Sequence, residues 1–145
     1  MNSEEVVSLV IPLFNEEALV ETLSERVTGA IKASGSNFEV VLVDDGSKDS
    51  TYLKLLEWQE KDNRVVIVQL SRNWGHQNAF NAGLDVATGD AVIFMDGDLE
   101  DPPEMIVKLI DQWRKGYEVV STVKRSRVQR PILRVLTRAY YKILG

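Results

Sequence analysis

The sequence predicts an α/β domain with a mostly parallel sheet that is flanked by helices on both faces. Short apolar runs rich in β-branched residues recur along the chain, helical patterns separate them, and a polar segment follows most of the runs. Strands that alternate with helices in this way are typical of parallel sheets whose two faces are covered. The chain has 145 residues, of which 44% are hydrophobic, so it is long enough to bury the core of one domain.

The apolar runs predict five strands, at residues 6–14, 38–43, 65–70, 91–95 and 117–123. The first helix is expected over 16–34, because apolar residues recur there every four positions and Gly35 follows. Further helices are expected over about 50–60, over 79–87, and from residue 102 onward. Ser50 is the expected cap of the second helix, and Pro102 and Pro103 fit the first turn of the fourth.

Polar segments follow the first four expected strands, at 14–16, 44–47, 71–73 and 96–98. Ligands of open parallel sheets bind outside the carboxyl ends of the strands, so these segments are expected to line one crevice. The sequence contains neither G-x-G-x-x-G after the first strand nor G-x-x-x-x-G-K-[ST], which argues against a dinucleotide site and a P-loop. A nucleotide held by acidic residues and a metal remains.

The stretch VIFMDGDLEDPPE places four carboxylates within six residues directly after a buried strand. Like charges repel one another and are costly beside an apolar core, so a cation is expected here. Asp96 and Asp98 form a D-x-D pair suited to Mg²⁺ or Mn²⁺, which take oxygen ligands and share them with substrate phosphates. Gly97 lets the backbone approach a ligand. The alternative is an ordinary turn that leads into a solvated helix start.

Two further carboxylates, Asp44 and Asp45, end the second expected strand. A carboxylate only accepts hydrogen bonds, so this pair suits the imide N–H of uracil or ribose hydroxyls better than a phosphate. The alternative is an Asx turn with a helix cap, for which the sequence DGS is sufficient.

The net charge of −5 conceals a division between an acidic body and a basic end. Residues 124–145 carry seven Lys or Arg and no acid, whereas the first 123 residues carry 10 basic and 22 acidic side chains. Such a basic segment is expected to meet phosphates on a lipid, a membrane surface or a nucleic acid. The chain has no cysteine, no secretory signal pattern and no apolar run near the ~20 residues of a membrane span, so a cytosolic setting is expected.

Four motifs, IPLFNEE, VDDGSKDST, NWGHQNAFNAGLDVATGD and FMDGDLEDPPE, occur in this order between Val7 and Glu104. Together they resemble the N-terminal catalytic half of glycosyltransferase family 2. They are most similar to its polyprenyl-phosphate branch, the dolichyl-phosphate mannosyltransferases and bactoprenol glucosyltransferases. The resemblance implies a GT-A fold, a nucleotide-sugar donor, a divalent metal and an inverting reaction. It also implies a chain that continues in relatives with more of the acceptor site and often transmembrane helices.

By this resemblance, Asp96 and Asp98 hold Mg²⁺ or Mn²⁺ on the donor diphosphate, with Asp98 counted as catalytic and Gly97 as donor-binding. Glu100 stands where relatives carry a third ligand, often Gln. The remaining donor-site residues implied are Pro12, Phe14, Asn15 and Glu16 at the nucleoside, Asp44 or Asp45 at the base, and Gly75, His76 and Gln77 in a donor-side loop. A structural hydrogen bond is the alternative role for His76.

The expected acceptor is a polyprenyl phosphate, whose phosphate is already charged at neutral pH and needs no general base. Lys124, or alternatively Arg125 or Arg127, is expected to neutralise it. After a donor-binding domain at 1–123, the segment 124–145 is expected to lie on an anionic membrane surface as a helix. Its cations recur every four residues, at Arg130, Arg134, Arg138 and Lys142. A packed or partner-binding helix is the alternative, and nucleic acid is disfavoured because the acidic body repels it.

The expected function is therefore an inverting, metal-dependent transfer of a hexose from a UDP-sugar, with UDP-glucose as the first choice. The acceptor is a polyprenyl phosphate at the cytoplasmic face of the membrane. Two alternatives stand beside this function: a family 2 transferase with a sugar or polymer acceptor, and a nucleotide-sugar-binding module without turnover. The sequence leaves self-association as a homo-oligomer open.

Overall fold

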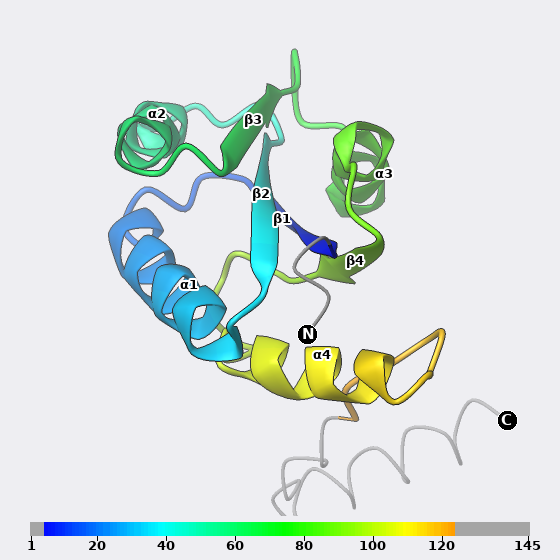
Figure 1. The fold of residues 1–145 in the computed structure, drawn as a ribbon. Coiled ribbons are helices and arrows are strands. Elements are labelled where there is room, and N and C mark those ends of the chain that lie inside the picture. Colours follow the sequence, from blue (N-terminus) through cyan, green and yellow to red (C-terminus); the bar gives the residue numbers. More distant parts are fainter. Residues whose placement is uncertain (1–4, 124–145) are drawn as a thin grey trace, which may run out of the picture.

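The computed structural model of this chain describes residues 5–123. Within them, four parallel strands form one sheet in the order β3–β2–β1–β4. The strands are β1 (Val6–Leu13), β2 (Asn37–Asp44), β3 (Val65–Gln69) and β4 (Ala91–Phe94). The helices, which alternate with the strands along the chain (Figure 1), are α1 (Val20–Ser34), α2 (Thr51–Lys61), α3 (His76–Val86) and α4 (Met105–Arg114). The predicted parallel α/β arrangement is confirmed.

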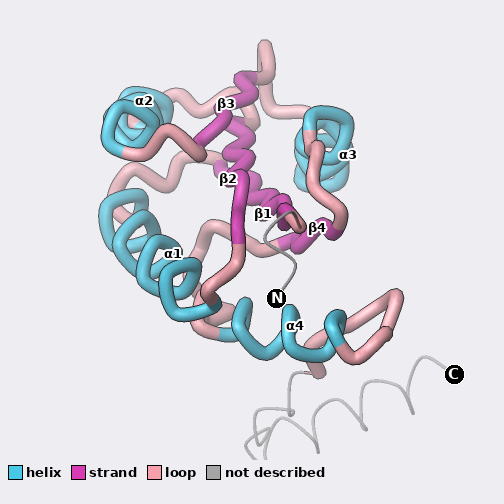
Figure 2. Tube along the Cα trace, viewed as in Figure 1, coloured by secondary structure: helices cyan, strands magenta, loops and turns pink. Residues whose placement is uncertain are grey.

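Helices cover both faces of the sheet. Figure 2 shows α3 on one side of the strands and α1, α2 and α4 on the other. Side chains of the central strand β1 alternate between these sides: Leu9 and Ile11 join the larger core, whereas Val10 shares a smaller cluster with Ala79 of α3. Helix α3 can approach β1 closely because Gly83 has no side chain; a Cβ atom there would lie 2.3 Å from Cγ1 of Val10.

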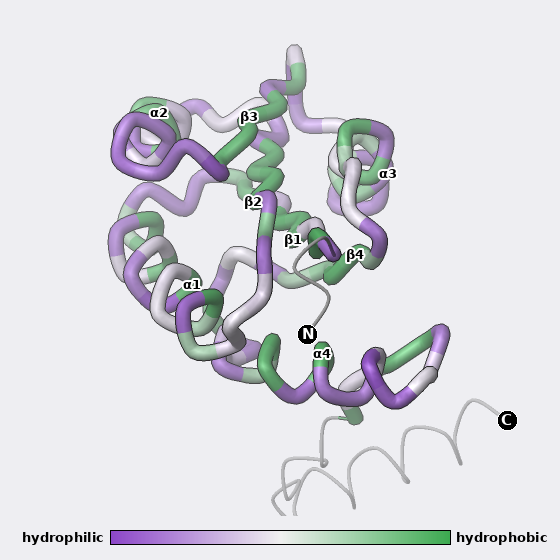
Figure 3. The backbone as a smooth tube through the Cα atoms, in the orientation of Figure 1, coloured by the Kyte–Doolittle hydropathy of each residue, from purple (hydrophilic) through white to green (hydrophobic). Residues whose placement is uncertain are grey.

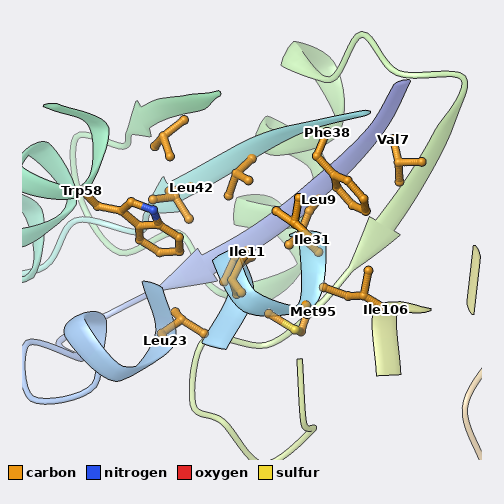
Figure 4. Packing of buried hydrophobic residues seen from close by; sticks show 14 of the residues in the cluster. Val7, Leu9, Ile11, Leu23, Ile31, Phe38, Leu42, Trp58, Met95 and Ile106 are labelled. Atoms are coloured by element: carbon orange, nitrogen blue, oxygen red, sulfur yellow. The ribbon is translucent and has the colours of Figure 1, made fainter. Parts of the chain in front are cut away.

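The larger core joins the apolar face of α1 to one side of the sheet. Figure 4 shows side chains of α1, the strands and α4 packed together, among them Leu23 and Ile31, which are 0% and 2% exposed. The four-residue spacing in the sequence therefore predicted the buried face of α1 correctly. Burial of each such side chain contributes about 1.5–3 kcal/mol. Figure 3 shows the strands as largely hydrophobic, whereas hydrophobic and hydrophilic residues alternate along the helices.

The fifth predicted strand is wrong, because residues 117–123 contain no strand in the structure. Val119 and Val123 of this segment are 88% and 86% exposed. β-branched residues favour a strand only where a neighbouring strand pairs with them and helps to bury their side chains. Strand β4, the edge of the described sheet, pairs with β1 alone, and no strand within residues 5–123 pairs with this segment.

Two helix starts differ from the predictions. Helix α1 begins at Val20, four residues later than predicted, because residues 17–19 form a turn that precedes it. Ser50 stands just before α2 as predicted, but its side chain makes no capping hydrogen bond. Instead, Oδ1 of Asp49 accepts a hydrogen bond of 2.9 Å from the amide of Thr51. The cap is therefore supplied one residue earlier than expected.

Helix α4 begins after both prolines rather than at them. Glu104 is its N-cap residue, and the Glu104 carboxylate accepts two hydrogen bonds from Arg26 of α1, at 3.0 and 2.7 Å. The pair is exposed, so it fixes how α4 lies against α1 more than it stabilises the fold. In the part of the chain that the structure describes, no helix is long and apolar enough to cross a membrane.

Glu39 joins three segments at the amino-terminal edge of the sheet. Its carboxylate accepts hydrogen bonds from the hydroxyl of Ser8 in β1 and from the amide and hydroxyl of Thr88, which precedes β4. The amide of Gly89 donates to the same Ser8 hydroxyl at 2.8 Å. Burial raises the pKa of Glu39, but the hydrogen bonds from Ser8, Thr88 and Gly89 outweigh burial and leave the pKa below its usual 4.5.

This lowered pKa makes stability depend on pH. Ionised Glu39 stabilises the fold above pH 4.5, and the contribution is lost as the pH falls through the folded-state pKa. Glu39→Gln should lower the free energy of unfolding at pH 7 by about 1–2 kcal/mol, because hydrogen bonds to a charged group are lost. Urea unfolding can be followed by circular dichroism at pH 7 and at about pH 3.5. The difference in free energy of unfolding between the parent and Glu39→Gln should be smaller at the lower pH.

The control is Glu60→Gln, a change of the same chemistry at an exposed position of α2. It should leave the free energy of unfolding nearly unchanged at both pH values. If the free energies of unfolding of Glu39→Gln and the parent differed as much at about pH 3.5 as at pH 7, the assigned role of the Glu39 carboxylate would be contradicted.

Candidate functional site

The loops that follow all four strands enclose one cavity of about 420 Å³ at the carboxyl edge of the sheet. Parallel strands all end at the same edge, which brings together motifs that are far apart in the sequence. The residues that line the cavity are Pro12, Leu13, Phe14, Glu16, Asp45, Asn73, Gly75, His76, Asp96, Gly97 and Asp98. Most of the residues predicted for the donor and metal sites therefore share one cavity.

Asn15 shapes this cavity without lining it. Its amide donates to Oγ of Ser47 at 2.9 Å, and its Oδ1 accepts from the amide of Lys48 at 2.8 Å. The next amide, of Glu16, donates to Oγ1 of Thr51 at 2.9 Å. These bonds join the loop after β1 to the loop after β2. Sequence reasoning placed Ser47 at this edge but missed its bond to Asn15 and the role of Thr51, although the Ser- and Thr-rich turn DGSKDST was a signal for such bonds.

Asp45 binds the loop that follows β3. Its Oδ1 accepts from the amide of Trp74 at 2.7 Å, and its Oδ2 accepts from the amide of Gly75 at 3.0 Å. Gly46, with a φ of 69°, makes this contact possible, because a Cβ atom there would lie 2.3 Å from the carbonyl carbon of Arg72. Two peptide amides therefore occupy both oxygens of a cavity-lining carboxylate.

Asp44 was the other candidate for contact with the base, and it is fully buried outside the cavity lining. Its Oδ1 accepts from the amide of Ser47 at 3.1 Å. Its Oδ2 is buried and makes no hydrogen bond within residues 5–123. Of the two predicted carboxylates, only Asp45 reaches the cavity.

The D-x-D turn brings two carboxylates to the cavity. Asp96, Gly97 and Asp98 line it, whereas Glu100 does not. Gly97 lies against β1, since a Cβ atom there would be 3.0 Å from the carbonyl oxygen of Pro12. The amide of Glu100 donates to Oδ1 of Asp98 at 2.9 Å. Within residues 5–123, no three His, Asp or Glu side chains gather as a metal-ligand set, so the predicted set of three carboxylates is not preassembled.

Acidic side chains dominate the cavity, which is lined by Glu16, Asp45, Asp96 and Asp98. The pKa of Glu16 is raised, first by burial and then by the negative charges of Asp98 and Asp49. A diphosphate would add further negative charge, so its binding here requires a cation. Mg²⁺ usually binds one or two carboxylates and completes its shell with substrate phosphates and water. The pair of Asp96 and Asp98 fits such an ion without a third protein ligand.

Three residues of the donor-side loop line the cavity: Asn73, Gly75 and His76. Helix α3 begins at His76, three residues earlier than predicted, because Gly75 with a φ of 90° turns the chain into it. Nε2 of His76 lies 3.1 Å from Oδ1 of Asp96. Gln77 is exposed and does not line the cavity. Asn73 lines the cavity, as expected for the segment 71–73 that follows the third strand, although it was not among the predicted donor-site residues.

The predicted catalytic cations Lys124, Arg125 and Arg127 lie outside the described residues, as does the rest of the basic segment 124–145. Among the residues that line the cavity, His76 alone has a basic side chain. The guanidinium of Arg72 lies nearby in sequence, but it stacks 3.8 Å from the ring centre of Trp74. The cavity itself is therefore suited to a metal-bound donor rather than to a bare anion.

A larger hollow of about 700 Å³ lies along the outer edge of the sheet. It is lined mainly by apolar side chains of β4, α4 and residues 117–123, including Ile106 and Tyr117. It receives none of the loops after β1, β2 and β3. The smaller cavity is the better candidate site because polar groups from four loops converge there.

Known proteins share both this sequence and this architecture. The family model described as Glycosyl transferase family 2 matches residues 8–143. The glycosyltransferase sll0501 of Synechocystis sp. is 41% identical over 139 residues, which cover 95% of this chain and 44% of that protein. The undecaprenyl-phosphate 4-deoxy-4-formamido-L-arabinose transferase of Aeromonas hydrophila is 44% identical over 130 residues, which cover 88% of this chain and 40% of that protein.

Among solved structures, the mannosyltransferase PcManGT from Pyrobaculum calidifontis in complex with GDP-Man and Mn²⁺ has a TM-score of 0.65. It is 26% identical, and the match covers 95% of this chain and 38% of that one. The chain thus spans less than half the length of these relatives. The predicted GT-A fold is confirmed. With a family model that matches nearly its whole length, the chain belongs to glycosyl transferase family 2.

Proposed function

We propose that this chain is the donor-binding part of an inverting, metal-dependent transferase that moves a hexose from a UDP-sugar to a polyprenyl phosphate. Glucose is the expected sugar, and the cytoplasmic face of the membrane is the expected place. The observation that carries the proposal is the cavity at the carboxyl edge of the sheet, which is lined by both carboxylates of the D-x-D turn. The same cavity carries Phe14, Glu16 and Asp45 from the predicted nucleoside motifs.

A divalent ion fits the chemistry of this cavity. Asp96 and Asp98 would hold Mg²⁺ or Mn²⁺, and the ion would supply charge neutralisation for the leaving diphosphate. The related mannosyltransferase was solved with Mn²⁺ and a nucleotide sugar, which supports the same use here. The raised pKa of Glu16 supports it too, because negative charge in the cavity is already disfavoured before any ligand enters.

The nucleoside would lie between the loops after β1 and β3. Phe14 is 39% exposed and offers an apolar surface beside Asp45 in the cavity. Asp45 already accepts two amide hydrogen bonds, and a carboxylate has further lone pairs with which to accept an imide N–H. Asp45 is therefore favoured over the buried Asp44 as the group that contacts the base.

A phosphate acceptor is favoured because it is a nucleophile already charged at neutral pH. The Aeromonas relative is named for undecaprenyl phosphate, which supports the same class of acceptor. Lys124, Arg125 and Arg127 are proposed to neutralise this phosphate. Assays of sugar transfer to undecaprenyl phosphate, of transfer to sugar acceptors and of donor hydrolysis would separate this function from a sugar-acceptor transferase and from a binding module without turnover.

The metal requirement can be tested at the D-x-D turn. Asp98→Ala should weaken Mn²⁺-dependent UDP binding by more than the roughly tenfold loss seen when a mere hydrogen-bond partner of a metal ligand is changed. Isothermal titration calorimetry with Mn²⁺ and with EDTA measures the effect. Asp111→Ala, at an exposed position of α4, is the matched control and should bind like the parent. Equal affinity of the parent for UDP in Mn²⁺ and in EDTA would exclude the metal.

Base selection gives a second test. If Asp45 accepts from the uracil imide, UDP should displace a fluorescent UDP probe at a concentration roughly 10- to 100-fold lower than CDP or ADP. A hydrogen bond to a charged acceptor contributes about 1.5–3 kcal/mol, which corresponds to roughly that ratio. GDP belongs in the same series because guanine also carries a ring N–H donor, at N1. Equal competition by UDP, CDP and ADP would exclude the assigned contact, and stronger competition by GDP would reassign the donor.

The proposed membrane role of residues 124–145 rests on charge. Near an anionic leaflet each Lys or Arg contributes about 1 kcal/mol, so replacing four of them with Gln should remove several kcal/mol of attachment. The substitutions are Arg130→Gln, Arg134→Gln, Arg138→Gln and Lys142→Gln, which leave helix propensity nearly unchanged. Sedimentation with anionic and with neutral vesicles should show binding of the parent to anionic vesicles only, weakened by salt. Undiminished sedimentation of the variant would assign the segment to protein packing instead.

A further inference from the structure

His76 contacts one of the two carboxylates of the D-x-D turn. Its Nε2 lies 3.1 Å from Oδ1 of Asp96, and both residues line the cavity. The two residues belong to different elements, since His76 opens α3 and Asp96 follows β4. An imidazole that carries its proton on Nε2 donates to this oxygen and leaves the second oxygen of Asp96 for another ligand.

The imidazole is held in place although its side chain is 59% exposed. The rings of His76 and Phe80 meet edge to face, with centres 4.5 Å apart and planes at 84°. Phe80 in turn meets Phe94 of β4 in the same way, at 5.0 Å and 86°. Such pairs contribute about 0.5–1.5 kcal/mol beyond the burial of their area. The aromatic row therefore fixes the His76 ring between α3 and β4.

The backbone before His76 is fixed as well. Asp45 accepts from the amides of Trp74 and Gly75, and Nδ2 of Asn78 donates to the carbonyl oxygen of Trp74 at 2.7 Å. Contacts thus run without a break from Asp45 at the end of β2, through this loop, to His76 and Asp96. They connect the carboxylate expected at the base with the carboxylate expected at the metal.

We propose that His76 is a positioning residue for Asp96, a role that rests on the metal-dependent function proposed above. Asp96 lies in a cavity with Glu16 and Asp98, whose negative charges repel it. In this role Nε2 of His76, 3.1 Å from Oδ1 of Asp96, donates to that oxygen and so directs the other oxygen toward a cation shared with Asp98. Hydrogen-bond partners of metal ligands typically contribute 10- to 100-fold in metal affinity.

Two substitutions separate the hydrogen bond from the ring packing. His76→Phe keeps an aromatic ring against Phe80 but has no N–H, whereas His76→Gln keeps an N–H donor but loses the ring. Mn²⁺ affinity is measured by electron paramagnetic resonance and by calorimetry, with and without UDP, and thermal unfolding is measured in EDTA. We expect His76→Phe to lose about tenfold in Mn²⁺ affinity at an unchanged unfolding temperature. His76→Gln should keep an affinity within about threefold of the parent, because its amide still donates to Asp96.

Parental Mn²⁺ affinity in His76→Phe would overturn the inference, and so would an equally weak His76→Gln, since the ring and not the donor would then matter. These results are distinct from a failure of the proposed function. If the parent itself binds UDP equally well in Mn²⁺ and in EDTA, the proposed metal-dependent function is contradicted, and so is the role of His76 that rests on it. If UDP binding by the parent depends on Mn²⁺ and both variants have the parental Mn²⁺ affinity, only the inference about His76 is contradicted.

Discussion

The position of β1 in the middle of the sheet is the constraint on which the rest of the structure depends. β1 pairs in parallel with β2 on one side and β4 on the other, and its side chains supply both cores. Each neighbour must therefore end at the same edge as β1, whatever follows it in the sequence. The polar loops meet because the apolar strands have no other favourable arrangement.

Once these loops meet, their carboxylates divide into two groups. One group accepts hydrogen bonds that hold the fold: Asp45, which also lines the cavity, binds the loop after β3, and Asp49 caps α2. The other group, formed by Asp96 and Asp98, lines the cavity on a turn whose backbone lies against β1. Backbone amides donate to both oxygens of Asp45, whereas Asp98 accepts one amide hydrogen bond, so the second group is the better suited to a cation.

Local patterns in the sequence predicted the features that local physics determines. The buried face of α1 follows from the spacing of Leu23 and Ile31, and the αL residue Gly35 ends that helix as expected. The shared cavity followed from one general property of parallel sheets. The missing strand at 117–123 could not be predicted, because strand formation depends on a distant edge and not on the segment itself.

Within the site, too, features set by the local sequence could be predicted, whereas features set by contacts between distant segments could not. Asp96 and Asp98 could be placed at the cavity from the sequence alone, because they directly follow a strand whose carboxyl end must face that edge of the sheet. The contact between His76 and Asp96 depends on how separate loops pack, so a single sequence contains no direct signal for it, and the turn DGSKDST signals only the class of bond that Asn15 makes.

The edge strand β4 has a consequence for the behaviour of the protein in solution. Within residues 5–123, no strand pairs with its outer edge, and Phe94, its last residue, is 49% exposed. An unpaired edge presents a row of free peptide groups, which is a template for association with any extended polypeptide. A segment that covered the outer edge of β4 would therefore protect the protein against aggregation as well as extend its sheet.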